Sequence, residues 1–337
     1  MPIRTAILGY GRSGSTLHAG PIEKRPEFEL AAVCDIDPEA RAKAFDRFGC
    51  RLYTDYHDML AKEDLDLVVI VTRSSQHSQM ACDCLEAGKN VLVTKPWALN
   101  LAEADQMVAA AARSGKKLLP WLPARWGSDL LRLRELVASG AIGKVFQVRR
   151  SEFTLGVRFD WQTEKKYGGG YLLNWGPHLV DQPMQLVGTP VASVYGEFKQ
   201  IINPGDVEDV FFAVLRTEDD VTIVTEFNIG AKGLPNWVVQ GDRGTIFVRE
   251  DEIEIHKAHF PDSFDVSSYR NKVDVEVVRE CLEGDRYGDN MAVYAHIAQA
   301  LTGQEPYRID LDSARGLTSA MDAIRRSAET GQVVRLI

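Results

Sequence analysis

A glycine-rich turn near the N-terminus places the strongest constraint on how this chain can fold. The apolar run Ile3–Leu8 is long enough for one buried strand, and Gly9, Gly11 and Gly14 follow it in the spacing G-x-G-x-x-G. In such a turn the first glycine permits the tight bend, the second lets the backbone approach a pyrophosphate, and the third lets the next helix pack on the strand. The start of that helix also attracts phosphate through its N–H groups and its dipole. The pattern predicts a dinucleotide-binding turn.

A second apolar run supports this interpretation because it ends in an acid. Leu30–Cys34 is followed by Asp35, at the offset where a carboxylate receives the ribose hydroxyls of the adenosine. This carboxylate would repel the 2′-phosphate of NADP, and Ile36 rather than an arginine comes next. The sequence therefore favours NAD as the cofactor, with NADP the less favoured choice.

Strand-like and helix-like segments alternate through the first part of the chain. Continuous apolar strands linked by helices indicate a parallel sheet covered on both faces. Asn100 and Glu103 form a capping box for one helix, which we expect to end near Gly115. We predict a doubly wound parallel sheet over residues 1–122. The expected strands are 3–8, 30–34, 65–71, 90–94 and 117–119, with helices over 39–48, 55–60, 76–87 and from Asn100 to about Gly115.

Ligands of such sheets bind beyond the carboxyl ends of the strands. Lys95 follows one buried strand and is pinned by Pro96, so it is either a surface lysine that snorkels to water or a charge held in the site. His77 opens the helix after Thr72 and is either a helix-cap or core residue or a cofactor contact. The expected cofactor-binding residues are Gly9, Gly11, Arg12, Ser13, Gly14, Asp35, Thr72, His77 and Lys95.

Beyond Gly143 the pattern changes to a series of strands separated by polar turns. Consecutive strands after a β–α series indicate a separate α+β domain with a largely antiparallel sheet. We therefore expect a second domain over residues 123–337, with an amphipathic helix ending at Gly140 near its start and two closing helices. The expected strands are 145–153, 191–199, 210–215, 221–227, 237–240, 245–248 and 253–256, and the closing helices are 291–301 and 313–330.

Between the first two of these strands, three polar residues share a helical spacing. If the segment is helical from about Tyr171, Asn174, His178 and Asp181 lie on one face, although Pro177 and Pro183 must strain or kink the helix. His178 is either a satisfied core histidine or a general acid/base poised near neutral pH.

Composition excludes several classes of function. A net charge of −9 argues against a nucleic-acid partner, and no apolar run approaches the ~18 residues of a membrane helix. The five cysteines are odd in number and contain no C-x-x-C pair, which indicates a reducing compartment without structural zinc. His256 and His259 lack a third ligand nearby, so no metal site is expected. No charged-then-apolar leader precedes the first strand, and we expect a soluble cytoplasmic protein.

Four motifs, taken in order, resemble those of the Gfo/Idh/MocA oxidoreductases, the group of glucose-fructose oxidoreductase and inositol 2-dehydrogenase. The similarity covers essentially the whole chain, and the spacing of the motifs identifies the family. The motifs are the turn Gly9–Gly14, the segment Ala87–Pro96, the segment Gly140–Lys144, and Gly168–Gly170 running to His178 and Asp181.

The resemblance implies a Rossmann domain that carries NAD(P) and a C-terminal domain whose open sheet often mediates oligomers, so a homodimer or homotetramer is expected. It also implies that Lys95 lies beside the nicotinamide and the reacting hydroxyl, and that His178 takes the hydroxyl proton. The chain departs from the family at two positions of these motifs. Thr94 stands where glutamate is usual, and Asn174 stands where aspartate is usual, so His178 lacks an anionic orienter.

The leading hypothesis is an NAD-dependent dehydrogenase or reductase that acts on a sugar, polyol or cyclitol. Lys95 would polarise the oxygen, His178 would serve as acid/base, and Asn174 would orient His178 or the substrate. One alternative is a glycosidase-type enzyme that oxidises, eliminates and returns the hydride without net redox change. Another is a non-enzymatic sensor that binds NAD and a sugar. Weaker substrate-pocket candidates are Arg125, Trp126, Trp161, Asp181 and Tyr287.

Overall fold

The chain divides into two compact units, and neither is one continuous segment. The structure is a computed structural model that describes residues 1–336. Unit 1 consists of residues 1–123, 160–177 and 288–322, and unit 2 of residues 124–159, 178–287 and 323–337. The boundary expected after residue 122 lies beside the end of the first segment of unit 1, but two later segments return to that unit.

Unit 1 contains a six-stranded sheet in which every pair of neighbouring strands is parallel. The spatial order is β3-β2-β1-β4-β5-β6, so the strand order reverses beside β1, as in a doubly wound fold. The central strands β1, β4 and β5 are mostly apolar and almost fully buried, which confirms the predicted sheet. The strands are β1 (Ile3–Leu8), β2 (Phe28–Cys34), β3 (Arg51–Tyr53), β4 (Leu67–Ile70), β5 (Asn90–Thr94) and β6 (Leu118–Trp121).

Several helices of unit 1 begin at side chains that cap their first N–H groups or end at a glycine. The side chain of Asp37 accepts from Glu39 N ahead of Pro38, and Asn100 accepts from Glu103 N while Glu103 Oε2 accepts from Leu99 N. The second of these helices ends at Gly115, which has φ +68°. The helices are α1 (Ala19–Lys24), α2 (Pro38–Phe48), α3 (Tyr56–Lys62), α4 (His77–Glu86), α5 (Leu101–Ser114), α9 (Asn290–Leu301) and most of α10 (Leu311–Thr330).

Short helical turns fill the connections of unit 1. A π-helical turn, η1 (Gly14–His18), directly follows the glycine-rich turn and leads into α1. The others are η2 (Ser74–Gln76), η4 (Trp161–Thr163) and η5 (Lys165–Tyr167).

Unit 2 contains a nine-stranded mixed sheet in the order β14-β13-β12-β11-β7-β10-β9-β8-β15. All neighbours are antiparallel except β7 and β10, which pair in parallel. The predicted open, largely antiparallel sheet is therefore confirmed. The strands are β7 (Val145–Phe153), β8 (Val191–Lys199), β9 (Val210–Thr217), β10 (Thr222–Asn228), β11 (Trp237–Gly241), β12 (Gly244–Arg249), β13 (Glu252–His259), β14 (Asp274–Cys281) and β15 (Val334–Arg335).

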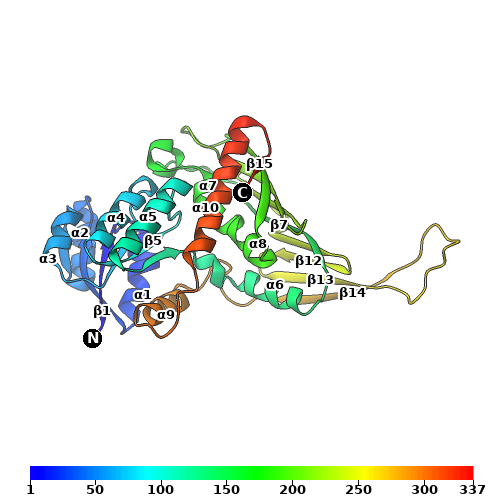
Figure 1. Ribbon diagram of the computed structural model, residues 1–337, viewed down its shortest axis with the longest axis horizontal. Helices are drawn as coiled ribbons and strands as arrows, with labels where there is room; N and C mark the ends of the chain where they lie inside the picture. The colour runs from blue at the N-terminus through cyan, green and yellow to red at the C-terminus, as the bar shows by residue number, and fades with distance from the viewer. Residues whose placement is uncertain (337) are drawn as a thin grey trace. The chain divides into compact units, whose positions relative to one another are not determined.

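Two helices pack on one face of this sheet and form the core of unit 2. α6 (Ser128–Ala138) contributes Leu130 and Leu133, and α8 (Asp181–Val187) contributes Leu186. These side chains meet alternate apolar residues from β7, β11, β12 and β13. The turn η3 (Pro123–Trp126) precedes α6, and α7 (Tyr171–Leu179) precedes α8. Figure 1 shows the β13–β14 connection reaching beyond the ends of its strands.

Candidate active site

The glycine-rich turn of unit 1 has the backbone geometry that its sequence predicts. Gly9 has φ +89°, and a Cβ there would lie 2.7 Å from Val71 O. A Cβ at Gly14 would clash with Gly9 O, so the helix start can only pack this closely on the turn without a side chain. At Gly11 nothing lies within 4 Å of the Cβ position, which leaves room for a ligand to approach the backbone.

Asp35 follows β2 and is held by backbone N–H groups next to this turn. Its two oxygens accept hydrogen bonds from Tyr10 N at 2.6 Å and Asp37 N at 2.8 Å. A cavity of about 370 Å³ lies alongside, and three of its lining residues are cationic. A carboxylate fixed at the strand end beside an open glycine and a cationic cavity fits the ribose and phosphates of a dinucleotide. The cavity is lined by Tyr10, Gly11, Arg12, Ser15, Asp37, Ala40, Lys43 and Arg47.

Arg12 and Ser13, also expected at the cofactor, lie at the start of η1. Arg12 is exposed, and its carbonyl accepts hydrogen bonds from the hydroxyls of Ser15 and Thr16. Ser13 is half-buried and precedes η1 directly.

Lys95 follows β5, and its ammonium is anchored on helix α7 within unit 1. Nζ donates to Asn174 O at 2.7 Å and to Asn174 Oδ1 at 2.9 Å. The Lys95–Pro96 peptide bond is cis. Because both acceptors of Asn174 are neutral, they orient the ammonium without cancelling its charge. The structure therefore brings Lys95 and Asn174, two of the three residues predicted to be catalytic, into direct contact.

Thr94, at the position where the resemblance leads one to expect glutamate, belongs to a neutral buried network. Its hydroxyl lies 3.4 Å from Nε2 of His18, and Nδ1 of His18 lies 2.8 Å from the hydroxyl of Tyr294. The ring of His18 also packs on Trp121, with centroids 4.6 Å apart. Complete burial lowers the pKa of His18 to about 3, so the imidazole is neutral at ordinary pH.

His77 bridges two strand ends through backbone carbonyls. Its Nδ1 lies 2.8 Å from Pro96 O and its Nε2 lies 3.1 Å from Thr72 O. Burial lowers the pKa of His77, although the hydrogen bonds to these two carbonyls oppose the shift. These two contacts hold the ring of His77 between the ends of the strands. The Thr72 hydroxyl is turned toward Met80 Sδ, at 3.4 Å.

The polar face expected from Asn174 to Asp181 is interrupted between two helices. α7 ends at Leu179 and α8 begins at Asp181, so Asn174 and His178 share a helix that does not include Asp181. The physical reason is Pro183, which has no N–H to donate to the carbonyl of Leu179. That carbonyl instead accepts from the hydroxyl of Thr225 at 2.9 Å.

His178 lies in unit 2 against the ring of Tyr287. The two ring centroids are 5.2 Å apart with an interplanar angle of 61°, and His178 is 7% exposed. The edge contact restricts how the imidazole can turn. Tyr287, one of the weaker substrate candidates, therefore lies directly beside His178.

Two other substrate candidates, Arg125 and Asp181, form an ion pair with each other. Arg125 Nε and Nη2 donate to the two oxygens of Asp181, both at 2.8 Å, and both side chains are almost fully buried. This bidentate ion pair joins η3 to the start of α8. Trp126 and Trp161 are half-buried, in η3 and η4 respectively.

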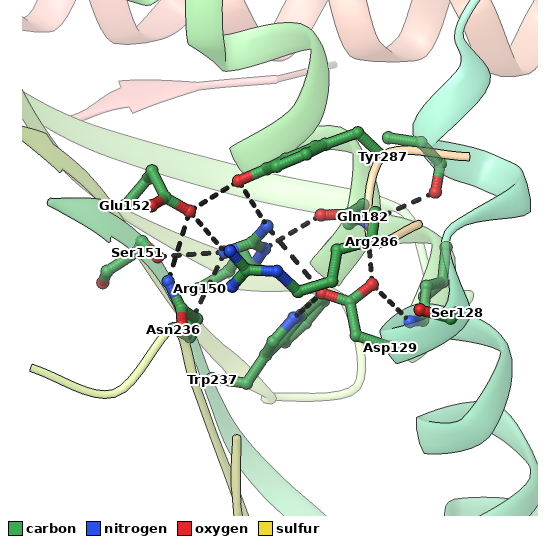
Figure 2. Close-up of polar contacts among 12 residues, drawn as sticks. Ser128, Asp129, Arg150, Ser151, Glu152, Gln182, Asn236, Trp237, Arg286 and Tyr287 are labelled. Atoms are coloured by element: carbon green, nitrogen blue, oxygen red, sulfur yellow. Dashed lines mark hydrogen bonds and ion pairs between the residues drawn. The ribbon is translucent and has the colours of Figure 1, made fainter. Parts of the chain in front are cut away.

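The sequence did not reveal a buried charged network that surrounds Arg150 in unit 2 (Figure 2). Arg150 is 0% exposed, and its Nε donates to Gln182 Oε1 at 2.9 Å. Its Nη2 lies 3.9 Å from the buried Asp129, and its Nη1 lies 3.8 Å from Glu152. The signal that was available is the period of two along β7, which puts Arg150 and Glu152 on the same face as the buried Val148.

Burial and neighbouring charges shift the pKa values of Arg150 and Tyr287 in this network. Burial by itself would lower the pKa of Arg150, but the oxygens of Tyr287, Asp129 and Glu152 outweigh it and the pKa is raised. Burial raises the pKa of Tyr287 well above its ordinary value, so its hydroxyl stays protonated and donates to Glu152 Oε2.

Residues 1–336 contain no group of three or more His, Cys, Asp or Glu side chains placed to hold a metal ion. His256 and His259 face Glu254 and Glu276 respectively. None of the described helices combines the length and apolar character needed to cross a membrane.

The N-terminal and C-terminal parts of the chain each match a known protein family. Residues 3–120 match a family model described as "Oxidoreductase family, NAD-binding Rossmann fold", and residues 130–247 match the model of the GFO/IDH/MocA C-terminal domain. The uncharacterized oxidoreductase YdgJ of Escherichia coli strain K12 is 32% identical over 245 residues, which cover 72% of this chain and 70% of that protein.

A relative of known activity and a solved structure are more distant. A myo-inositol 2-dehydrogenase of Thermotoga maritima is 25% identical over 257 residues, covering 75% of this chain and 72% of that protein. The crystal structure of an NAD-binding protein from Listeria innocua is 26% identical, with a TM-score of 0.84, and covers 99% of this chain and 97% of the other.

Proposed function

The chain belongs to the GFO/IDH/MocA family of NAD-binding oxidoreductases, and from this premise we propose that it moves a hydride between nicotinamide and a carbon of a sugar, polyol or cyclitol. The family was predicted from four sequence motifs and is confirmed. The relative that acts on myo-inositol supports a polyhydroxy substrate.

The observation that carries this proposal is helix α7. It holds Asn174, whose carbonyl and side-chain oxygens fix Lys95 Nζ, and it holds His178 one helical turn later. Side chains four residues apart on a helix are neighbours. We propose that this spacing lets one substrate carbon be served by an ammonium and an imidazole.

Each side chain has a distinct part in the proposed reaction. The bound nicotinamide supplies the hydride acceptor or donor. His178 accepts the hydroxyl proton at a ring nitrogen during oxidation and returns it during reduction, a transfer typical of general acid/base catalysis. Lys95 stabilises the negative charge that develops on the oxygen. Asn174 holds Lys95 in place, and Tyr287 limits the rotation of His178.

The proposal is tested by following the absorbance of reduced nicotinamide. A panel of sugars, polyols and inositols is incubated with the protein and either NAD or NADP, and we expect substrate-dependent reduction that is faster with NAD because of Asp35. Turnover without accumulation of reduced cofactor, with nucleotide that survives desalting, would instead favour the glycosidase-type alternative. Sugar binding with no redox exchange in either direction would favour a sensor.

We also propose that the protein acts in the cytoplasm as a homo-oligomer, a dimer or tetramer. All five cysteines are free thiols, which agrees with a reducing compartment. Light scattering coupled to size-exclusion chromatography measures the mass of the assembly, and a mass of 37.5 kDa would contradict oligomerisation.

A further inference from the structure

Glu152 stands out in unit 2 because only one of its two carboxylate oxygens is used by the protein. Oε2 accepts hydrogen bonds from the hydroxyl of Tyr287 and from Nδ2 of Asn236, the latter at 3.2 Å. Oε1 makes no hydrogen bond to any of residues 1–336, and the Glu152 side chain is 16% exposed. A carboxylate can only accept hydrogen bonds, so this oxygen is available to a donor from outside the protein, either water or a bound molecule.

The neighbours of Glu152 fix the carboxylate in this orientation. Asn236 cannot turn its amide round, because its Oδ1 already accepts from Glu250 N at 2.9 Å. Arg150 Nη2 donates to the hydroxyl of Tyr287 at 3.4 Å, so the Tyr287 proton is directed to Glu152. The hydrogen bonds therefore run in one direction, from Arg150 through Tyr287 to Glu152. Figure 2 marks both contacts with dashed lines.

Arg150 is the buried cation that faces Glu152 in this partly buried position. Arg150 Nη1 lies 3.8 Å from Oε2, and Arg150 is in turn balanced by Asp129 at 3.9 Å. Two more charged groups lie near Tyr287: the Cζ of Arg286 is 5.8 Å from the ring centroid, and Asp285 Oδ1 accepts from Tyr287 N at 2.7 Å. An ionised acceptor forms stronger hydrogen bonds to a hydroxyl than a neutral acceptor does.

Tyr287 also connects this carboxylate to the predicted acid/base. One side of the residue packs on His178, with ring centroids 5.2 Å apart, and its hydroxyl contacts Glu152. The imidazole and the carboxylate are thus held apart by a single rigid aromatic side chain. That separation suits a molecule with several hydroxyl groups, one of which reacts while another is recognised.

We propose that Glu152 is a specificity-determining residue, whose Oε1 accepts a hydrogen bond from a non-reacting hydroxyl of the substrate while Tyr287 holds it in register with His178. This inference rests on the proposed function for the class of substrate, a sugar, polyol or cyclitol. It adds a residue of β7 that selects among such compounds by the position of a second hydroxyl.

The test measures binding rather than turnover. The full-length chain saturated with NADH is titrated by calorimetry with myo-inositol, scyllo-inositol, D-glucose and sorbitol. We expect Glu152→Gln to weaken the binding of the best probe by about 10- to 100-fold, the range for a hydrogen bond to a charged group. NADH affinity should be unchanged.

Glu226→Gln is the matched control. Glu226 lies on the adjacent strand β10 and also accepts from an asparagine amide, Asn228 Nδ2 at 3.1 Å, but it has no contact with Tyr287 among the described residues. Its substitution should leave probe affinity at the wild-type value. Equal affinities for wild type and Glu152→Gln would overturn the proposal.

Monodeoxy analogues of the best probe identify the hydroxyl. For the wild type, one analogue should bind about 10- to 100-fold more weakly than the parent, whereas Glu152→Gln should no longer distinguish the two. A wild type and variant that discriminate equally among all the analogues would also overturn the proposal.

Two further outcomes separate this inference from its premise and from a folding defect. Probe binding that depends on Glu152, without any redox exchange, would support the inference while contradicting the proposed oxidoreductase reaction. If no probe binds the wild type, the inference fails. If Glu152→Gln does not fold, the variant Tyr287→Phe provides the test, because it keeps the ring beside His178 but removes the hydrogen bond to Glu152 Oε2. We expect its probe affinity to fall about 3- to 10-fold. An unchanged affinity would contradict the proposal.

Discussion

In the sheet of unit 1 the central strands are mostly apolar, and the side chains expected to do chemistry stand just beyond the strand ends. In the sheet of unit 2, by contrast, β7 carries Arg150 and Glu152 on the face that α6 and α8 cover. The first arrangement uses backbone geometry to receive a ligand, as at Gly9 and Asp35. The second uses buried charges, each of which needs a partner. We therefore expect single substitutions to have different effects in the two units. In unit 1 they should act on backbone packing and cofactor affinity, and in unit 2 on catalysis and on the stability supplied by buried charges.

The largest expected effect concerns the chemistry contributed by unit 2. His178→Ala should reduce turnover by ~10²–10⁴, the usual loss when a general acid/base is removed, and should leave NAD affinity near the wild-type value. Steady-state kinetics and cofactor titration measure the two quantities. His259→Ala, which changes an exposed histidine of β13, is the control and should have no effect. Unchanged turnover in His178→Ala would remove this residue from the mechanism.

The next prediction compares two adjacent arginines of β7. Arg150→Met leaves Asp129 and Glu152 without their buried cation and should lower the free energy of unfolding by about 3–5 kcal/mol. Arg149→Met, on the exposed face of the same strand, should change it by less than about 0.5 kcal/mol. Urea titrations followed by tryptophan fluorescence measure both. Equal losses for the two variants would show that the buried charges of unit 2 are not a special source of stability.

In unit 1 the corresponding contrast is between two glycines. Gly14→Ala forces a Cβ against Gly9 O and should cost about 1–3 kcal/mol of stability, as overpacking does. Gly11→Ala meets nothing within 4 Å, so stability should be retained while NAD affinity falls because the methyl group occupies the approach to the backbone. Thermal unfolding and cofactor titration separate the two effects. A Gly11→Ala protein with full NAD affinity would contradict the dinucleotide role of the turn.

The smallest effect is a pH dependence in unit 1. The pKa of His18 is lowered to about 3 by burial, so below the ordinary pKa of 6.5 the unfolded chain binds a proton that the folded chain does not. The free energy of unfolding should therefore fall as the pH drops from about 6.5 towards 3, by at most ~1.4 kcal/mol per pH unit from this group. Above pH 6.5 His18 contributes no slope.

His18→Gln removes this titration and provides the check. Urea titrations between pH 4 and 7 should show a shallower pH dependence for the variant than for the wild type. Identical slopes would mean that His18 does not carry the effect.

Much of unit 1 could be predicted from the sequence because local signals and tertiary structure agree there. The predicted strands 3–8 and 90–94 are the observed β1 and β5, and the capping box at Asn100 begins α5 as expected. In unit 2 the predicted bounds of β7 and β8 are also the observed ones. What was missed is β14, whose side chains are mostly exposed, because it is defined by pairing with β13 rather than by burial of an apolar face. The short strands β3 and β15 were missed as well.

The candidate site also contains features that local sequence predicts and features that only tertiary contacts determine. The glycine turn and Asp35 were found because their function lies in the backbone and in a fixed spacing. The contact of Lys95 with Asn174 and the pairing of Arg125 with Asp181 join residues far apart in the chain, and no local pattern reports such contacts. Two adjacent arginines, Arg149 and Arg150, look alike in the sequence, and only the sheet determines which one is buried.

The discontinuous make-up of the two units limits how the protein can be cut or recombined. A fragment ending at residue 123 would lose α9 and α10. With them it would lose Tyr294, whose hydroxyl contacts His18, and the carbonyl of Ala300, which accepts from Lys117. Exchange of the cofactor module between relatives therefore requires five junctions, after residues 123, 159, 177, 287 and 322, rather than a single one. A chimera joined only near residue 123 would combine the first strands of one parent with the closing helices of another.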